Sequence, residues 1–142
     1  MTTTHKGKRA EFLVFSELLR KEADVYVPLA DIGIDAIIRK QDGKIIEIQV
    51  KSTEQGEDEQ CFQIAKSKIK TKTNRYIILV DMSEGENKED VEFWILPAKE
   101  YIAHSTGTEY LKLDLDAAPN HGKRLRRDLL KKYKNAWEDL LE

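Results

Sequence analysis

The sequence is short of the residues on which several protein classes depend. Its single cysteine, Cys61, has no partner for an internal disulfide. No apolar run approaches the roughly 20 residues that a membrane-spanning helix needs, and no secretory leader opens the chain. We therefore expect a cytoplasmic protein with no membrane role, and 142 residues are enough for one domain with its own hydrophobic core.

Side chains for several other chemistries are also missing. The three histidines show no metal-ligand spacing, which together with the lone cysteine disfavours a zinc site. No glycine-rich phosphate loop is present, and no histidine base lies near Ser52 or Ser67 in sequence. Nucleotide-dependent and serine-hydrolase activities therefore have little support.

The chain lacks the positive excess of a general nucleic-acid coat protein, since its formal net charge is −2. Its basic residues are nevertheless gathered in two segments. Five fall between Lys66 and Arg75 with no acid among them, and seven fall between Lys123 and Lys134 against the one acid Asp128. These segments are consistent with a polyanion-binding face, and also with ordinary solvated helices and loops.

Apolar spacing predicts an α/β chain. A first amphipathic helix is expected over about residues 7–23, because apolar residues recur there at helical spacing. They are Phe12, Val14, Phe15, Leu18 and Leu19. Short β-branched segments bounded by turn residues predict strands. These cover residues 25–29, 32–39, 44–53, 61–64, 75–82, 91–96 and 110–115, the last at a sheet edge.

Helical structure is also predicted in the second half of the chain. Pro97 is suited to the first turn of a helix, and residues 65–73 read as a basic turn or helix. Near the end, apolar residues at helical spacing predict a basic C-terminal helix of about five turns over residues 122–141. They are Leu125, Leu129, Tyr133, Trp137 and Leu140. Residues 1–142 are expected to form a single domain.

The hairpin predicted over residues 32–53 brings several polar residues together. Even-numbered positions are apolar in both strands, so the odd-numbered residues share the opposite face. For both apolar faces to meet the core, the residue numbers of two cross-strand partners must add up to an even number. A three-residue turn at residues 41–43 satisfies this condition. Closing Lys40 against Lys44 gives a sum of 84 and sets Asp35 opposite Gln49. The polar face of the hairpin then contains Asp35, Glu47, Gln49 and Lys51.

Glu11 is a further candidate, because it shares its side of the first helix with Val14 and Leu18. A carboxylate on an apolar stripe is costly without a partner. The alternative is that the polar face of the hairpin is exposed to solvent. Asp35 and Lys51 would then form an ion pair worth less than about 1 kcal/mol, and Glu11 would be a helix acid favoured by the macrodipole.

These residues resemble the core of the PD-(D/E)XK nucleases. Residues 6–14 resemble the first helix of archaeal Holliday junction resolvases and other members, and residues 33–35 followed by 48–53 are similar to the metal-binding core. Ile34 stands where the motif has proline, and Gln49 stands where most members have an acid, as in Mrr-like restriction endonucleases. The resemblance is specific over about the first 55 residues. It implies a restriction-endonuclease-like α/β core with a mixed central sheet flanked by helices.

The resemblance also implies an activity, a metal-dependent DNA endonuclease that hydrolyses phosphodiester bonds with Mg²⁺ or Mn²⁺. Asp35, the side-chain oxygen of Gln49 and the Val50 backbone carbonyl would hold the metal, and Glu11 would act through water. Lys51 would orient the attacking water and stabilise negative charge. Glu47 is either a migrated carboxylate or a solvated neighbour, and we favour the neighbour.

The basic segments supply candidate phosphate contacts, with the C-terminal helix expected near the substrate groove. The residues are Lys66, Lys68, Lys70, Arg124, Arg127 and Lys131. One alternative is a nuclease-derived DNA-binding or assembly module that has lost cleavage because Gln49 weakens the metal site. Another is a plain interaction domain. The sequence does not choose among junction resolution, restriction and repair, and it leaves a homodimer open.

Overall fold

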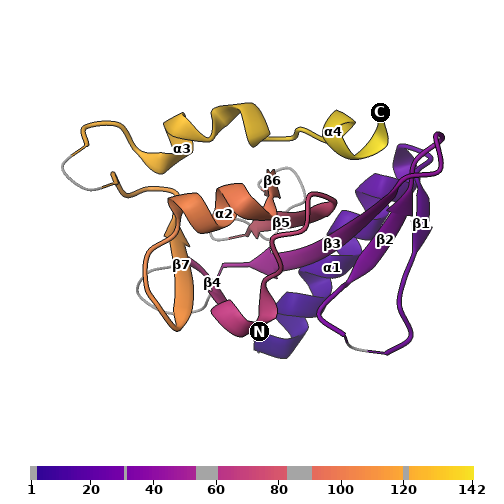
Figure 1. Ribbon diagram of the computed structural model, residues 1–142, viewed down its shortest axis with the longest axis horizontal. Helices are drawn as coiled ribbons and strands as arrows, with labels where there is room; N and C mark the ends of the chain where they lie inside the picture. The colour runs from indigo at the N-terminus through magenta and orange to yellow at the C-terminus, as the bar shows by residue number, and fades with distance from the viewer. Residues whose placement is uncertain (1–2, 31, 54–60, 83–90, 120–121) are drawn as a thin grey trace.

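A mixed five-stranded sheet forms the centre of the computed structural model, which describes residues 3–30, 32–53, 61–82, 91–119 and 122–142 (Figure 1). In spatial order its strands are β1 (Asp24–Tyr26), β2 (Ala36–Arg39), β3 (Ile45–Ser52), β5 (Arg75–Asp81) and β6 (Glu92–Pro97). β3 and β5 are parallel, and the other neighbours are antiparallel. A smaller antiparallel sheet contains β4 (Cys61–Ala65) and β7 (Tyr110–Asp114).

Helices flank the central sheet, which confirms the expected architecture. The helical elements are α1 (Thr3–Arg20), η1 (Lys66–Lys68), α2 (Ala98–His104), α3 (Arg126–Leu129), η3 (Lys131–Tyr133) and α4 (Glu138–Leu141). In the described part of the chain, none of them is long and apolar enough to cross a membrane.

The two faces of the central sheet are buried in two separate hydrophobic clusters. On one face, Ala10, Val14 and Leu18 of α1 pack against apolar residues of β2, β3 and β5. The other face carries Ile77 and Leu79 of β5, which pack against β4, β7 and α2. The apolar run of β5 is therefore buried on both faces, as its sequence predicts.

The first helix differs from its prediction in extent and orientation. It begins at Thr3 rather than near Gly7, and it ends at Arg20 rather than near Ala23. Phe12 and Leu19, which we expected in the core, have exposed fractions of 66% and 65%. The helix carries two adjacent apolar stripes, and the sheet covers only the stripe that contains Ala10 and Val14.

The connection between β1 and β2 is longer than predicted. β1 ends at Tyr26 rather than residue 29, and β2 begins at Ala36 rather than residue 32. Pro28 has no N–H to donate to a neighbouring strand, and Gly33 adopts a positive φ of 81°. These two residues release the chain from the sheet just before Asp35.

The predicted continuous C-terminal helix over residues 122–141 is wrong. The segment forms α3, η3 and α4, interrupted at Asn135, whose φ is 55°. The Asn135 N–H donates to the Phe93 carbonyl at 2.9 Å, and Lys134 forms an isolated bridge with Trp94 of β6. This edge contact breaks the helix.

The interruption has a packing reason. Leu130 and Tyr133 pack in the cluster on the β4–β7 side of the sheet, whereas Trp137 and Leu140 pack in the cluster beneath α1. A straight helix lies against one face of a sheet and cannot fill both clusters. Burial on both sides of β6 therefore overrides the helical spacing of the sequence.

Candidate active site

The hairpin of β2 and β3 has the register that the sequence predicts. Ala36 pairs with Ile48 and Ile38 pairs with Ile46, so that paired residue numbers sum to 84. Asp35 lies immediately before β2. Its N–H donates to the Ile48 carbonyl at 2.8 Å, and its Oδ2 accepts the Val50 N–H at 2.7 Å. The Asp35 carboxylate therefore lies against the peptide that joins Gln49 to Val50.

Asp35 departs from regular strand pairing. Ile48 is the register partner of Ala36, yet its carbonyl also accepts the N–H of Asp35, so that two residues of one strand oppose one of the other. This is the arrangement of a β-bulge, which re-aims a side chain. Simple alternation does not describe the direction of Asp35.

Glu11 and Asp35 line one cleft of about 260 Å³. The cleft lies between α1 and the β1–β2 connection. Its lining residues are Lys8, Glu11, Val27, Pro28, Leu29, Ala30, Ile34 and Asp35. The structure thus brings the helix acid and the strand acid together. Both acidic residues line the same opening.

Lys8 is a residue of this cleft that our sequence reasoning missed. Its Nζ lies 3.3 Å from Glu11 Oε2, one helical turn away. The side chain of Lys8 is 67% exposed, so this ion pair contributes little to stability. The available signal was the spacing of a cation three residues before the candidate acid.

Gln49 is buried on the β3 face that adjoins Ile77 and Leu79 of β5. Its exposed fraction is 6%, and its Oε1 has no hydrogen-bond partner among the described residues. A buried polar atom left without a partner costs roughly 1–3 kcal/mol. Such an oxygen is suited to a bound cation. The alternative that the polar face of the hairpin is exposed to solvent is therefore wrong at Gln49.

Lys51 follows on the same face of β3, and its side chain is half-buried. Within the described ranges it makes no ion pair, so its ammonium group remains available to an anion. Neither Lys51 nor Gln49 belongs to the lining of the cleft that contains Glu11. Asp35 is the link between that cleft and β3 through its hydrogen bond to Val50.

The Val50 carbonyl has a suitable direction for a metal ligand. In a strand, the N–H and the C=O of one residue point to the same side. The Val50 N–H points to Asp35, and its carbonyl therefore points to the Asp35 side of β3 as well. This geometry is compatible with the ligand set that the resemblance implies.

Glu47 is not the solvated neighbour that we expected. It is 7% exposed, and its Oε1 lies 3.5 Å from both Lys72 Nζ and Arg75 Nη2. Arg75 is its register partner on β5 and is itself buried. The carboxylate of Glu47 is thus engaged by two cations at the other end of the polar face.

The acidic residues alone do not complete a metal site. Among the described residues, no three His, Cys, Asp or Glu side chains are placed to hold an ion together. A hard cation here would need the amide oxygen of Gln49 and a backbone carbonyl besides Asp35 and Glu11. The buried Gln49 oxygen, which has no partner in the described part of the chain, fits that requirement.

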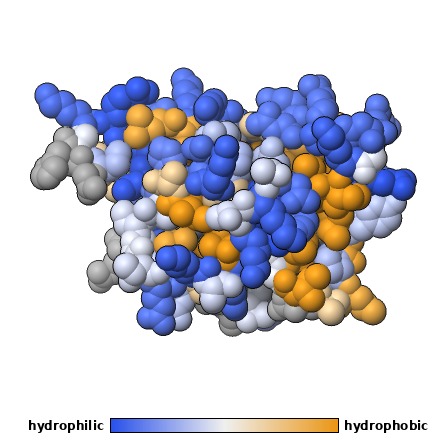
Figure 2. Space-filling view, in the orientation of Figure 1, coloured by the Kyte–Doolittle hydropathy of each residue, from blue (hydrophilic) through white to orange (hydrophobic). Residues whose placement is uncertain are grey.

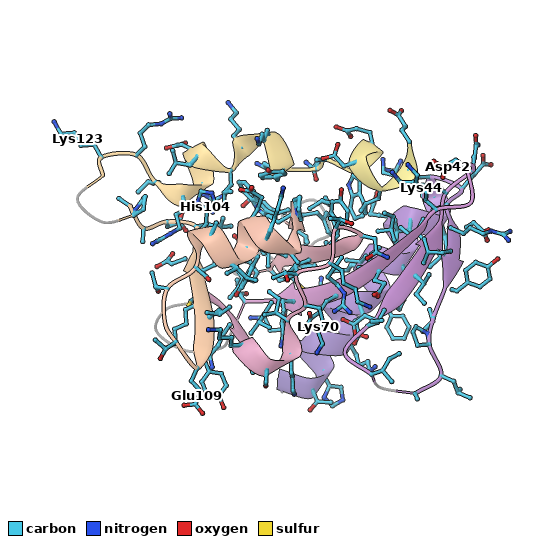
Figure 3. All side chains as sticks on the ribbon, viewed as in Figure 1. Asp42, Lys44, Lys70, His104, Glu109 and Lys123 are labelled. Carbon is cyan, nitrogen blue, oxygen red and sulfur yellow. The ribbon has the colours of Figure 1, made fainter. Side chains whose placement is uncertain are left out.

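The two basic segments lie on different sides of the molecule. Figure 1 shows η1 at the same edge as the first turns of α1, whereas α3 and α4 run along the opposite edge. Figure 3 likewise shows Lys70 and Lys123 far apart. Lys40 Nζ donates to the Glu142 backbone oxygen at 2.6 Å, at the hairpin end away from Asp35. The C-terminal segment therefore lies away from the cleft that Glu11 and Asp35 line, and its position near a substrate groove stays a prediction.

Arg127 is held by acids within the protein. Its guanidinium lies 2.7 Å from Glu92, 2.9 Å from Asp116 and 5.5 Å from the centre of the Trp94 ring. Burial lowers the pKa of Arg127, but hydrogen bonds to Asp116 and Glu92 outweigh it and raise the pKa overall. Burial likewise opposes ionisation of Glu92, yet Lys134 and Arg127 lower its pKa. We therefore do not retain Arg127 among the phosphate contacts.

The exposed cations of the first basic segment are better placed for phosphate contacts than Arg127. Lys66 and Lys68 of η1 are exposed, and so is Lys70 just after it. Arg124 and Lys131 are exposed as well, but they belong to the C-terminal segment along the opposite edge.

Comparisons with known proteins agree with this geometry. A model of the PD-(D/E)XK endonuclease family matches residues 1–134. The structure of the bacterial homing endonuclease I-Ssp6803I has a TM-score of 0.66 and 20% identity, covering 99% of this chain and 94% of that one. Hjc, a Holliday junction resolvase from Archaeoglobus fulgidus, has a TM-score of 0.54 and 14% identity, covering 77% and 84%. No curated protein matches the sequence. The fold is restriction-endonuclease-like.

Proposed function

The chain belongs to the PD-(D/E)XK endonuclease family, and we propose that it is a metal-dependent DNA endonuclease whose catalytic residues are Glu11, Asp35, Gln49 and Lys51. The observation that carries this proposal is the position of Asp35. Asp35 lines the cleft with Glu11, and its carboxylate accepts the N–H of Val50, the residue between Gln49 and Lys51, at 2.7 Å.

The residues at this position fit Mg²⁺ or Mn²⁺. Asp35, Gln49 Oε1 and the Val50 carbonyl are oxygen ligands of the kind that such cations prefer, and Glu11 would act through water. When bound, the ion polarises a phosphodiester and makes a water molecule more acidic. The amide of Gln49 supplies no negative charge, so Asp35 carries most of the attraction for the cation.

Lys51 and Glu11 have separate tasks in this proposal. The Lys51 ammonium stabilises the negative charge that develops on the phosphoryl oxygens and orients the attacking water. Glu11 exchanges its contact with Lys8 for a hydrogen bond to water at the cleft. Lys66, Lys68 and Lys70 would hold the DNA backbone by contacts to phosphate groups.

A cleavage panel tests the proposed activity. Linear, nicked, flapped and four-way DNA are incubated with the protein and Mg²⁺ or Mn²⁺, with EDTA as the control, and the mass in solution is measured by light scattering. We expect cleavage that stops in EDTA and returns when metal is restored in excess. A wild-type protein inert on every DNA with either metal would contradict the proposal.

Glutamate in place of Gln49 is expected to strengthen metal binding. The substitution adds a negative charge beside Asp35, and carboxylate charge raises the affinity of oxygen sites for divalent cations, here roughly tenfold. Calorimetric titration with Mn²⁺ measures the change, and Mn²⁺ should also raise the melting temperature of Gln49→Glu more than that of wild type. Gln41→Glu, at the exposed hairpin turn, is the matched control. Equal affinity in all three proteins would argue against Gln49 as a ligand.

The second candidate function is a DNA-binding module that has lost cleavage. Gln49 favours it, because an amide replaces the acid found in most members of the superfamily. Salt-sensitive DNA binding without Mn²⁺ binding at millimolar concentration would select this module over the enzyme.

A further inference from the structure

The charge of the cleft beside Asp35 comes from three side chains. Among its described lining residues, only Lys8, Glu11 and Asp35 are charged. One ammonium group against two carboxylates gives these side chains a net charge of −1 at neutral pH. The β1–β2 connection supplies apolar lining residues, and Figure 2 shows hydrophobic atoms gathered at the lower right, where Figure 1 draws this connection. Apolar walls concentrate the field of the charges between them.

The one cation of this described lining is held by one of the two acids. Lys8 Nζ lies 3.3 Å from Glu11 Oε2, one turn away on α1. The lysine side chain is 67% exposed, whereas that of Glu11 is 20% exposed. A pair with so exposed a cation is weak, so a competing ion can separate it. The flexible stem of Lys8 allows its ammonium group to leave Glu11 and stay at the cleft.

A divalent cation held beside Asp35 would reverse the sign of this charge. Two positive charges added to a net charge of −1 give +1. Without the ion, the cleft repels the phosphates of DNA, and Lys8 is engaged by Glu11. With the ion, Glu11 no longer needs the lysine, and the cleft attracts phosphate.

We propose that Lys8 couples metal binding to DNA binding. It pairs with Glu11 in the metal-free protein and with a DNA phosphate in the metal-bound protein. This inference rests on the proposed nuclease function and adds to it an order of binding, in which the metal precedes the DNA. Coupling between two ligands is reciprocal, so DNA raises the affinity for metal by the same factor.

Two titrations of the full-length protein test the coupling without requiring cleavage. All proteins carry Lys51→Ala, so that the DNA stays intact. Calorimetry measures Mn²⁺ binding, and fluorescence anisotropy measures binding of short labelled linear and four-way DNA in EDTA and in Mn²⁺ at constant ionic strength. We expect Mn²⁺ to raise the DNA affinity roughly tenfold. Lys8→Met should bind Mn²⁺ roughly threefold more tightly, because Glu11 loses its competing cation. It should nevertheless lose most of the Mn²⁺-dependent rise in DNA affinity, with less than about a twofold change in EDTA.

Three further variants separate this role from a general effect of charge. Lys6→Met removes the same charge from α1 outside the described cleft lining, and it should keep both the Mn²⁺ affinity and the rise. Lys8→Arg keeps a cation and should keep the rise. Glu11→Gln releases Lys8 without metal, so it should raise the DNA affinity in EDTA severalfold, and the added Lys8→Met change should cancel that gain. Since Lys8 is exposed, its replacement is not expected to disturb folding.

The outcomes distinguish the coupling from the proposed function. If Lys8→Met weakens DNA binding equally in EDTA and in Mn²⁺, Lys8 is an ordinary phosphate contact and the coupling is overturned. Unchanged affinities for both ligands overturn it as well. In both cases, cleavage by the protein with its native Lys51 leaves the nuclease proposal intact. Failure of that protein to cleave any DNA with either metal overturns the proposed function itself.

Discussion

Asparagine in place of Asp35 is expected to lower the DNA cleavage rate by a factor on the order of 10³. The side-chain oxygen of asparagine can still accept the Val50 N–H, so the hairpin keeps the hydrogen bond that Asp35 makes at 2.7 Å. What is lost is the negative charge that faces both the cleft and β3. Because Gln49 is already neutral, no other residue of β2 or β3 at this position replaces that charge.

The measurement is the single-turnover cleavage rate with Mn²⁺, accompanied by circular dichroism to check folding. Asp24→Asn is the matched control, since Asp24 is an exposed acid whose carboxylate accepts hydrogen bonds from Arg39 on the far part of β2 and from the Tyr26 hydroxyl. Lys51→Ala should show a loss of at least about 10²-fold, and Lys44→Ala at the hairpin turn should show none. A fully active Asp35→Asn protein would remove Asp35 from the mechanism.

Alanine in place of Trp137 is expected to destabilise the protein by about 3–5 kcal/mol. The indole is 6% exposed, and its ring centre lies 5.3 Å from that of Phe93. It fills the cluster beneath α1 from the C-terminal segment, so its removal leaves a cavity between that segment and the sheet. Loss of this contact should also release α4.

Urea unfolding followed by circular dichroism gives the free energy of unfolding, and the melting temperature should fall by roughly 10 °C or more. Leu129→Ala is the control, because Leu129 belongs to the same segment but is 36% exposed. It should cost less than about 1 kcal/mol. Equal effects of the two substitutions would contradict the anchoring role of Trp137.

The hairpin register was predictable because two simple constraints coincide in it. A period of two fixes which residues of β3 face the core, and the length of the turn fixes their partners. Ile38, Ile46 and Ile48 are paired as that argument requires. The burial of β5 on both faces was also predictable, because its continuous apolar run is a property of that one segment.

The features that escaped prediction depend on contacts distant in sequence. Phe12 and Ala10 both lie on apolar stripes of α1, and only packing against the sheet decides which stripe is buried. The bulge at Asp35 and the cleft shared with Lys8 arise where the β1–β2 connection meets α1. The break at Asn135 arises from pairing with Phe93. Spacing within one segment contains no information about such partners.

The contact between Lys134 and Trp94 has a consequence for how copies of this chain can associate. β6 is the last strand of the central sheet on one side, and the C-terminal segment occupies its outer edge through this bridge and the Asn135 N–H. β1, the strand at the other edge of the sheet, is three residues long, so its exposed edge is short. Exposed strand edges are templates for pairing with another chain. With one edge occupied and the other short, an assembly of this protein is expected to form through side-chain surfaces rather than by extending its sheet from one molecule to the next.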